Sequence, residues 1–186
     1  LEDMLVHSVN TAAVRTLLRA GGPKPAIAVA QRLGLAGPFP QDATLALGTG
    51  QASLLELVSA YAAFANGGLH VEPFGLAAAR GGNTLRSLPP PDPARVMTVD
   101  QAYAIRRALE SVVARGTARA AAVPGRLVGG KTGTTQDSRD AWFIGFSGRT
   151  VIGVWLGNDD ATPMNDVQGG TLPARLFHEI LEEIPR

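Results

Sequence analysis

The segment Gly130-Lys131-Thr132-Gly133-Thr134 holds the side chains best suited to chemistry. In a strand, Lys131 and Gly133 point to one face, and the two threonines point to the other. An ammonium can hold a carboxylate, hydroxyls can hydrogen-bond it, and a glycine lets a ligand approach the backbone. A free strand edge can also pair with a peptide. The segment favours a strand that binds a carboxylate-ended peptide, with an ordinary surface hairpin as the alternative.

Residues 125–132 also match the phosphate-loop pattern G-x-x-x-x-G-K-[ST] letter for letter. A phosphate loop needs a buried strand before its first glycine and a helix that starts at its lysine and threonine. Pro124 stands where that strand should enter the turn, and residues 133–138 are poor helix formers. A P-loop nucleotide-binding protein is therefore a disfavoured alternative.

Composition narrows the class of protein. The chain has 186 residues, a net charge of +1, 45% hydrophobic residues, no cysteine and three histidines. A chain of this length can build a core without metal or disulfide staples, and its charge gives no basic field for nucleic acid. The absence of cysteine excludes thiol catalysis and cysteine-bound zinc. The histidines are scattered, so we expect no metal and no cofactor.

Apolar residues at helical spacing predict five helices. The expected helices start at residues 11, 26, 53, 98 and 171. Asn10 or Thr11 is the expected cap of the first helix, and Thr171 that of the last. Ser53 and Thr98 each begin a capping box, in which the cap residue and a Glu or Gln three positions on bond each other's backbone.

Runs of β-branched and aromatic residues predict strands between these helices. The expected strands cover residues 127–135, 141–146 and 150–156, with a further hairpin in 71–88 around Gly81-Gly82-Asn83. A short turn, Ser147-Gly148-Arg149, should join the last two strands into an antiparallel hairpin. This order of elements predicts an α+β fold with an antiparallel sheet flanked by helices, instead of a doubly wound one.

Two motifs together point to a family. Lys131-Thr132-Gly133 is the K-T-G element that penicillin-binding proteins and class A β-lactamases combine with S-x-x-K and a Ser-x-Asn element. Ser8-Val9-Asn10 supplies the Ser-x-Asn element, more than a hundred residues earlier. The sequences LALGTGQASLLELVSAYAAFANGG and GGKTGTTQDSRDAWFIGFS resemble the transpeptidase domain of class A (bifunctional) penicillin-binding proteins. The resemblance covers nearly the whole chain and is least informative over residues 80–93.

The resemblance implies a penicillin-binding protein/serine β-lactamase-like fold and roles for individual residues. In that family the serine of S-x-x-K attacks the penultimate D-alanine of a peptidoglycan stem peptide. By resemblance, Ser8 would relay a proton to the leaving amine, and Asn10 would hydrogen-bond the substrate amide. Lys131 would polarise Ser8 and attract the substrate carboxylate. Thr132 and Thr134 would bind that carboxylate, and the backbone amide of Thr134 would form half of the oxyanion hole.

One family element is absent from this sequence. No serine is followed by a lysine three residues on, so the nucleophile and its base are missing. In the family this element precedes Ser-x-Asn, and only seven residues precede Ser8 here. We therefore expect residues 1–186 to be an N-terminally truncated transpeptidase domain, without S-x-x-K, glycosyltransferase domain and membrane anchor. Covalent catalysis cannot begin without the nucleophile.

The resemblance predicts a peptidoglycan D,D-transpeptidase on the periplasmic side of the inner membrane, inactive as this fragment. The expected partners are stem peptides ending in D-Ala-D-Ala and β-lactams, without nucleic acid. Surfaces exposed by truncation could also support a dimer. A non-catalytic peptide- or partner-binding module on the same fold is the main alternative, and a serine β-lactamase is a weaker one. No window approaches the 18 apolar residues of a membrane span.

Overall fold

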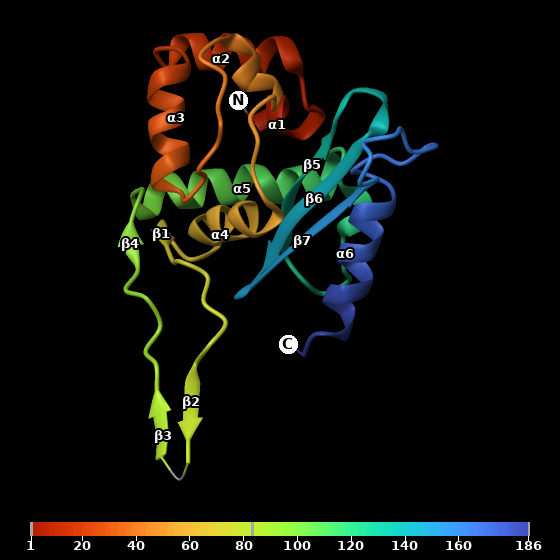
Figure 1. Ribbon diagram of the computed structural model, residues 1–186. Helices are drawn as coiled ribbons and strands as arrows, with labels where there is room; N and C mark the ends of the chain where they lie inside the picture. Colours follow the sequence, from red (N-terminus) through yellow and green to blue (C-terminus); the bar gives the residue numbers. More distant parts are fainter. Residues whose placement is uncertain (1, 83, 186) are drawn as a thin grey trace.

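A three-stranded antiparallel sheet forms the centre of the computed structural model, which describes residues 2–82 and 84–185 (Figure 1). Its strands are β5 (Val128–Thr134), β6 (Asp140–Ser147) and β7 (Thr150–Gly157), in the spatial order β5-β6-β7. Ser147 pairs with Thr150, so Gly148 and Arg149 form the turn between β6 and β7. Gly148 has a φ of +58°, which glycine adopts without strain. The predicted hairpin of these two strands is confirmed.

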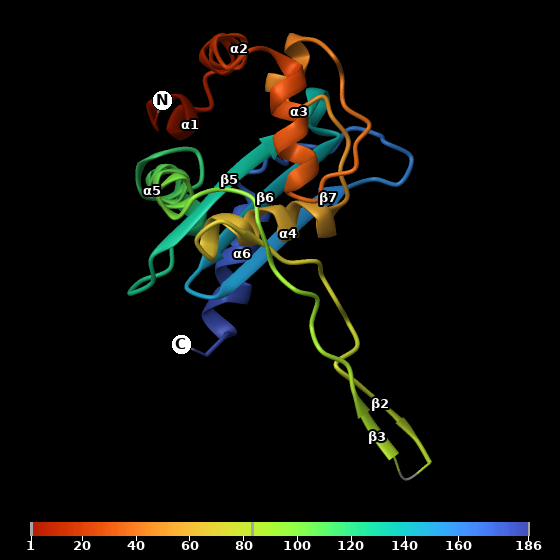
Figure 2. The same cartoon turned by 90° about the vertical axis from the view of Figure 1, so that its left-hand side faces the viewer.

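Helices cover both faces of this sheet. α4 (Leu54–Ala65) and α5 (Val99–Arg115) pack on one face, and α6 (Leu172–Glu183) packs on the other (Figures 1 and 2). The combination of an antiparallel sheet with flanking helices confirms the predicted α+β class. Among the described residues, no helix is long and apolar enough to cross a membrane.

The remaining elements are short. The N-terminal part consists of α1 (Glu2–His7), α2 (Asn10–Arg19), α3 (Pro23–Arg32) and the 3-10 helix η1 (Ala43–Leu47). Two more 3-10 turns, η2 (Arg119–Ala121) and η3 (Gln136–Ser138), flank β5. Between α4 and α5, β1 (Leu69–His70) pairs with β4 (Ala94–Arg95), and β2 (Ala78–Gly81) pairs with β3 (Thr84–Ser87). The β2–β3 hairpin projects away from the other elements (Figures 1 and 2).

The core between the sheet and α6 explains why a glycine directly precedes Lys131. Phe143 of β6 and Phe177 of α6 are both 0% exposed, and their rings form a T-shaped pair with centroids 4.8 Å apart. A Cβ atom on Gly130 would lie 2.5 Å from Cζ of Phe143 and 2.8 Å from the carbonyl oxygen of Ile144. Glycine is therefore required at this position, because it lets β5 close over the Phe143 ring.

The helix-start predictions are partly right. Both capping boxes are present, with reciprocal bonds between Ser53 and Glu56 and between Thr98 and Gln101. The prediction of a cap at Asn10 or Thr11 is wrong, since Val9 occupies the N-cap of α2 and no side chain caps that helix.

At the last helix, Thr171 occupies the N-cap of α6 but caps no helical amide. Its hydroxyl turns back instead, donating to the carbonyl oxygen of Gln168 at 2.8 Å and accepting from the Gln168 amide at 3.1 Å. The predicted side-chain cap is therefore wrong. The predicted hairpin within residues 71–88 is confirmed in a shorter form, and Asn83 of its expected turn lies outside the described residues.

Candidate active site

The Ser-x-Asn and K-T-G motifs meet in the folded chain. Nζ of Lys131 donates a hydrogen bond to Oγ of Ser8 at 3.0 Å and a second one to the carbonyl oxygen of Thr132 at 3.2 Å. Ser8 and Lys131 are 123 residues apart in the sequence. Ser8 lies in the turn between α1 and α2, where its φ of +53° lies in the left-handed region. The structure thus brings together two groups that the resemblance assigns to one catalytic site, and their roles stay predictions.

The position of Ser8 depends on how α1 is held against α5. Val6 is 0% exposed and belongs to the core beneath α5. The Thr117 amide, just beyond α5, donates to the Val6 carbonyl oxygen at 3.2 Å. Arg115 forms ion pairs of 2.8 Å with Glu2 and 3.0 Å with Asp3. α5 also packs directly on β5, so it places the turn that carries Ser8 beside Lys131.

An open pocket of about 890 Å³ extends from this contact along the sheet. Five of the six predicted site residues line it: Asn10, Lys131, Thr132, Gly133 and Thr134. The other walls include residues 47–52 and two side chains of α4, Leu57 and Tyr61. Since Asn10 caps no helix, its carboxamide is available to a ligand in this pocket.

β5 presents a free edge to this pocket because it is an outer strand of the sheet. The Thr135 amide donates to the Asp140 carbonyl oxygen at 3.0 Å, toward β6. Since successive residues of an antiparallel strand alternate between the two edges, the Thr134 amide points away from β6. This edge can pair with a peptide, and the Thr134 amide can donate to an oxyanion.

The two threonines lie on the face of β5 opposite to Lys131, as the alternation predicts. Oγ1 of Thr132 shares a hydrogen bond of 2.9 Å with Oγ1 of Thr117. Oγ1 of Thr134 accepts one of 3.0 Å from the Gly169 amide, so its own O–H remains able to donate to an anion. Gly169 also approaches the backbone closely, since a Cβ atom there would lie 2.5 Å from the Gly133 carbonyl oxygen.

Burial lowers the pKa of Lys131 below its ordinary value of 10.5, because the charged ammonium loses part of its hydration. Between the folded and unfolded pKa values the unfolded chain binds more protons, so stability rises with pH through that window. Below the folded pKa the cost of the buried charge is fully present. We expect Lys131→Met to be most stabilising, relative to the parent chain, near neutral pH, with the difference shrinking toward pH 10.5.

Urea unfolding of both chains at several pH values between about 7 and 10.5 measures this difference. Loss of the bond to Ser8 opposes this stabilisation, so the change of the difference with pH, and not its sign at one pH, carries the test. A difference that stays constant across the range would contradict the assigned cause.

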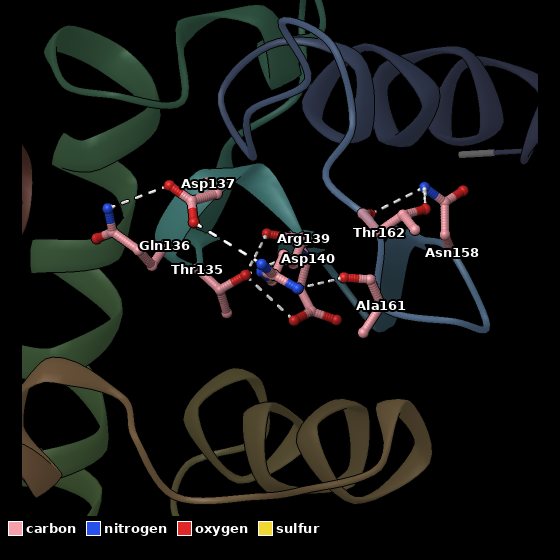
Figure 3. Close-up of polar contacts among 8 residues, drawn as sticks. All are labelled: Thr135, Gln136, Asp137, Arg139, Asp140, Asn158, Ala161 and Thr162. Carbon is pink, nitrogen blue, oxygen red and sulfur yellow. Dashed lines mark hydrogen bonds and ion pairs between the residues drawn. The ribbon is translucent and has the colours of Figure 1, made fainter.

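A second polar cluster holds the segment that follows Thr134 (Figure 3). The Asp140 amide donates to Oγ1 of Thr135 at 2.8 Å, and this hydroxyl donates to Oδ2 of Asp140 at 3.1 Å. Nε1 of Trp155, on β7, donates to Oδ1 of Asp140 at 2.9 Å. Arg139 donates to the Ala161 carbonyl oxygen at 2.7 Å, which ties this segment to the loop after β7.

Asp140 and Trp142 also line the pocket, and neither was predicted from the sequence. The alternation of β6 could have found them, because Ile144 pairs with Lys131 and every second residue of a strand shares a face. Among the described residues, no group of three or more His, Asp or Glu side chains could hold a metal ion. Lys131 and Thr132 lie inside β5 and start no helix, so the P-loop alternative is wrong.

Curated relatives share sequence with most of this chain. Penicillin-binding protein 1A of Aquifex aeolicus is 41% identical over 167 residues, which is 86% of this chain and 22% of that protein. Penicillin-binding protein 1A of Neisseria cinerea is 35% identical over 181 residues, or 92% of this chain and 23% of that protein. The chain thus spans less than a quarter of the length of these relatives.

Solved structures share the fold. Penicillin-binding protein 3 of Mycobacterium tuberculosis, complexed with aztreonam, aligns with a TM-score of 0.79 and 26% identity over 97% of this chain and 50% of that one. The PonA1 protein of Mycobacterium tuberculosis, in complex with penicillin V, aligns with a TM-score of 0.86 and 24% identity over 98% of this chain and 55% of that one. The penicillin-binding protein fold expected from the two motifs is therefore confirmed.

A family profile decides the assignment. The profile of the penicillin binding protein transpeptidase domain matches residues 36–182. Ser8 and Asn10 precede this range, so their assignment rests on the contact with Lys131 and on the pocket. The match includes β5, β6, β7 and nearly all of α6. Because it covers most of the sequence, the chain belongs to the penicillin-binding protein transpeptidase domain family.

Proposed function

We propose that this chain is the substrate-binding part of a peptidoglycan D,D-transpeptidase. The observation that carries the proposal is the 3.0 Å bond from Lys131 to Ser8, at the end of a pocket that runs along the free edge of β5. A cation, hydroxyls and a free strand edge in one place suit a peptide that ends in a carboxylate. Class A relatives at up to 41% identity support the same reaction.

Each site residue has a proposed role in this reaction. The peptide pairs with β5, its carboxylate is attracted by Lys131, and the Thr132 and Thr134 hydroxyls donate to it. Asn10 hydrogen-bonds the peptide amide, and Gly133 leaves room for the ligand backbone. As a serine oxygen bonds to the penultimate D-alanine carbonyl carbon, the Thr134 amide stabilises the oxyanion. Ser8 relays the proton that the attacking serine loses to the departing D-alanine nitrogen. An amine from a second peptide later attacks the same carbonyl carbon, and its proton returns to the serine oxygen as that oxygen leaves.

The attacking serine is a separate part of the proposal. None of the seven serines of this chain has a lysine three residues on. We therefore propose that residues 1–186 are part of a larger transpeptidase domain whose S-x-x-K element lies outside them, in a protein anchored on the periplasmic side of the inner membrane. Dimerisation through exposed surfaces stays a prediction. β7 supplies a sheet edge for it, since among the described strands it pairs only with β6.

Fluorescent penicillin tests this function in two proteins. The first is the 186-residue chain, and the second is a longer protein from the same reading frame that includes an S-x-x-K serine. We expect the longer protein to be labelled covalently, with competition by ampicillin, and the 186-residue chain to stay unlabelled. Replacing the S-x-x-K serine by alanine in the longer protein is the control, and it should abolish labelling.

Two outcomes count against the proposal. Stoichiometric labelling of the 186-residue chain would show that it contains a nucleophile. A longer protein that stays unlabelled, although the chain binds a D-Ala-D-Ala peptide, would favour the second candidate. That candidate is a non-catalytic peptide-binding module, which the missing S-x-x-K element suggests.

A further inference from the structure

Thr117, the second residue after α5, joins three elements beside the pocket. Its amide donates to the Val6 carbonyl oxygen of α1 at 3.2 Å, and its hydroxyl shares a hydrogen bond of 2.9 Å with Oγ1 of Thr132 on β5. A Cβ atom on Gly170, just before α6, would lie 2.4 Å from the Thr117 carbonyl oxygen. Thr117 does not itself line the pocket, whereas Thr132 does. Thr117 can therefore act on a ligand through the side chain of Thr132.

The two hydroxyls of β5 that line the pocket are held in different ways. Oγ1 of Thr134 accepts from the Gly169 amide at 3.0 Å, and a backbone N–H can only donate. Thr132 has the Thr117 hydroxyl as its partner, and either oxygen of that pair can be the donor. A hydroxyl carries one O–H, so Thr132 can donate to a ligand only when Thr117 supplies the proton of the shared bond. The direction of this bond therefore decides whether Thr132 can bind an anion.

The spacing of these two hydroxyls suits one carboxylate. Thr132 and Thr134 are two residues apart on the same face of β5, so their Cβ atoms lie about 7 Å apart. A carboxylate between them can accept from both hydroxyls at about 2.7 Å, the usual length of a bond from a hydroxyl to an anion. This arrangement requires the Thr117 hydroxyl to be the donor of the shared bond. Its donation to Oγ1 of Thr132 also polarises the Thr132 O–H toward the anion.

We propose that Thr117 is a positioning residue for the carboxylate of the bound peptide. Its hydroxyl donates to Oγ1 of Thr132, and the Thr132 hydroxyl donates to the carboxylate. This inference rests on the proposed function, which places the carboxylate at Thr132 and Thr134. Because the Thr117 amide also holds Val6, the same residue connects the carboxylate site to the helix that precedes Ser8.

Two substitutions separate the hydroxyl of Thr117 from its shape. Thr117→Val keeps the β-branched shape and removes the hydroxyl, whereas Thr117→Ser keeps the hydroxyl and removes the methyl group. NMR titration of the 186-residue chain and of both variants with N-acetyl-Lys-D-Ala-D-Ala measures the dissociation constants. We expect Thr117→Val to weaken binding about 5-fold, as for the loss of one hydrogen bond, and Thr117→Ser to bind as the parent chain does. Unchanged binding by Thr117→Val, or equal losses in both variants, would overturn the proposal.

A double-mutant cycle locates the effect at Thr132. Thr132→Val removes the hydroxyl that touches the carboxylate, so Thr117 then has no hydroxyl to position. Adding Thr117→Val to Thr132→Val should therefore change the dissociation constant by less than about 2-fold. Thr84→Val removes an exposed hydroxyl from the β2–β3 hairpin, outside the pocket, and should leave binding unchanged. A further loss of about 5-fold in the Thr132→Val background would mean that Thr117 acts at another place, which overturns the proposal.

The same peptide with an amidated C-terminus separates this inference from the proposed function. If the parent chain binds the two peptides equally well, the carboxylate site itself is wrong, and both proposals fail. If amidation weakens binding and Thr117→Val does not, the proposed function stands and the role of Thr117 fails. The bond from Thr117 to Val6 uses the backbone amide, so neither substitution removes this contact of α1.

Discussion

Replacing Lys131 by glutamine is expected to weaken the binding of N-acetyl-Lys-D-Ala-D-Ala by about 10- to 150-fold, since a hydrogen bond to a charged group contributes about 1.5–3 kcal/mol. The ammonium of Lys131 is partly buried at the end of the pocket, where water screens it less than at the surface. Glutamine keeps a donor of similar length but removes the charge. NMR titration of the parent chain and of Lys131→Gln with this peptide measures the loss.

The chain offers a matched control for this variant, because Lys24 is its only other lysine. Lys24 is exposed on α3 and does not line the pocket. Lys24→Gln changes the net charge by the same amount and should leave the dissociation constant unchanged. An equal loss in both variants would mean that overall charge, and not a contact at Lys131, attracts the peptide.

Replacing Phe177 by alanine is expected to lower the free energy of unfolding by about 3–5 kcal/mol, the usual cost of a large aromatic cavity. Phe177 is 0% exposed, and its ring contacts that of Phe143 in the core between α6 and the sheet. For a chain of this length the midpoint of thermal unfolding should fall by about 6–20 °C. Circular dichroism melting and urea unfolding measure both quantities.

Ile180 provides the control on the same helix. It is 45% exposed, so Ile180→Ala removes aliphatic volume without opening a cavity in the core. We expect its effect to stay below about 1 kcal/mol. Similar losses in the two variants would contradict the assigned contact of Phe177 with the sheet, because alanine favours a helix at both positions and cannot itself cause the loss.

Local signals in the sequence predicted the elements well. The capping boxes at Ser53 and Thr98 are formed by residues only three positions apart, so their geometry is encoded locally. The same local rule failed at Asn10, where the side chain lines the pocket instead of capping α2. α1 carries little helical signal of its own, and its contacts with Val112 and Arg115 hold it in place.

The residues of the two motifs in the candidate site could be predicted from the sequence. The other residues that line the pocket were not predicted. Side-chain alternation alone is enough to place Lys131 and the two threonines on opposite faces of β5. The approach of Ser8 to Lys131 came from family resemblance, because no local pattern relates residues 123 positions apart. Asp140 was missed, although alternation along β6 places it on the same face as Ile144, the partner of Lys131. Its hydrogen bond from Trp155 comes from the neighbouring strand, which no local pattern indicates.

The bond between Ser8 and Lys131 also has a consequence for the order of folding. Closing a loop of 123 residues costs more chain entropy than any helix or hairpin of this fold, and the cost must be met before the contact itself contributes. α5 and the β6–β7 hairpin form from residues close in sequence, whereas α1 can dock only on a finished α5. We therefore expect the pocket to form late in folding, and we expect a ligand that contacts both motifs to bind chains in which Ser8 and Lys131 have already met.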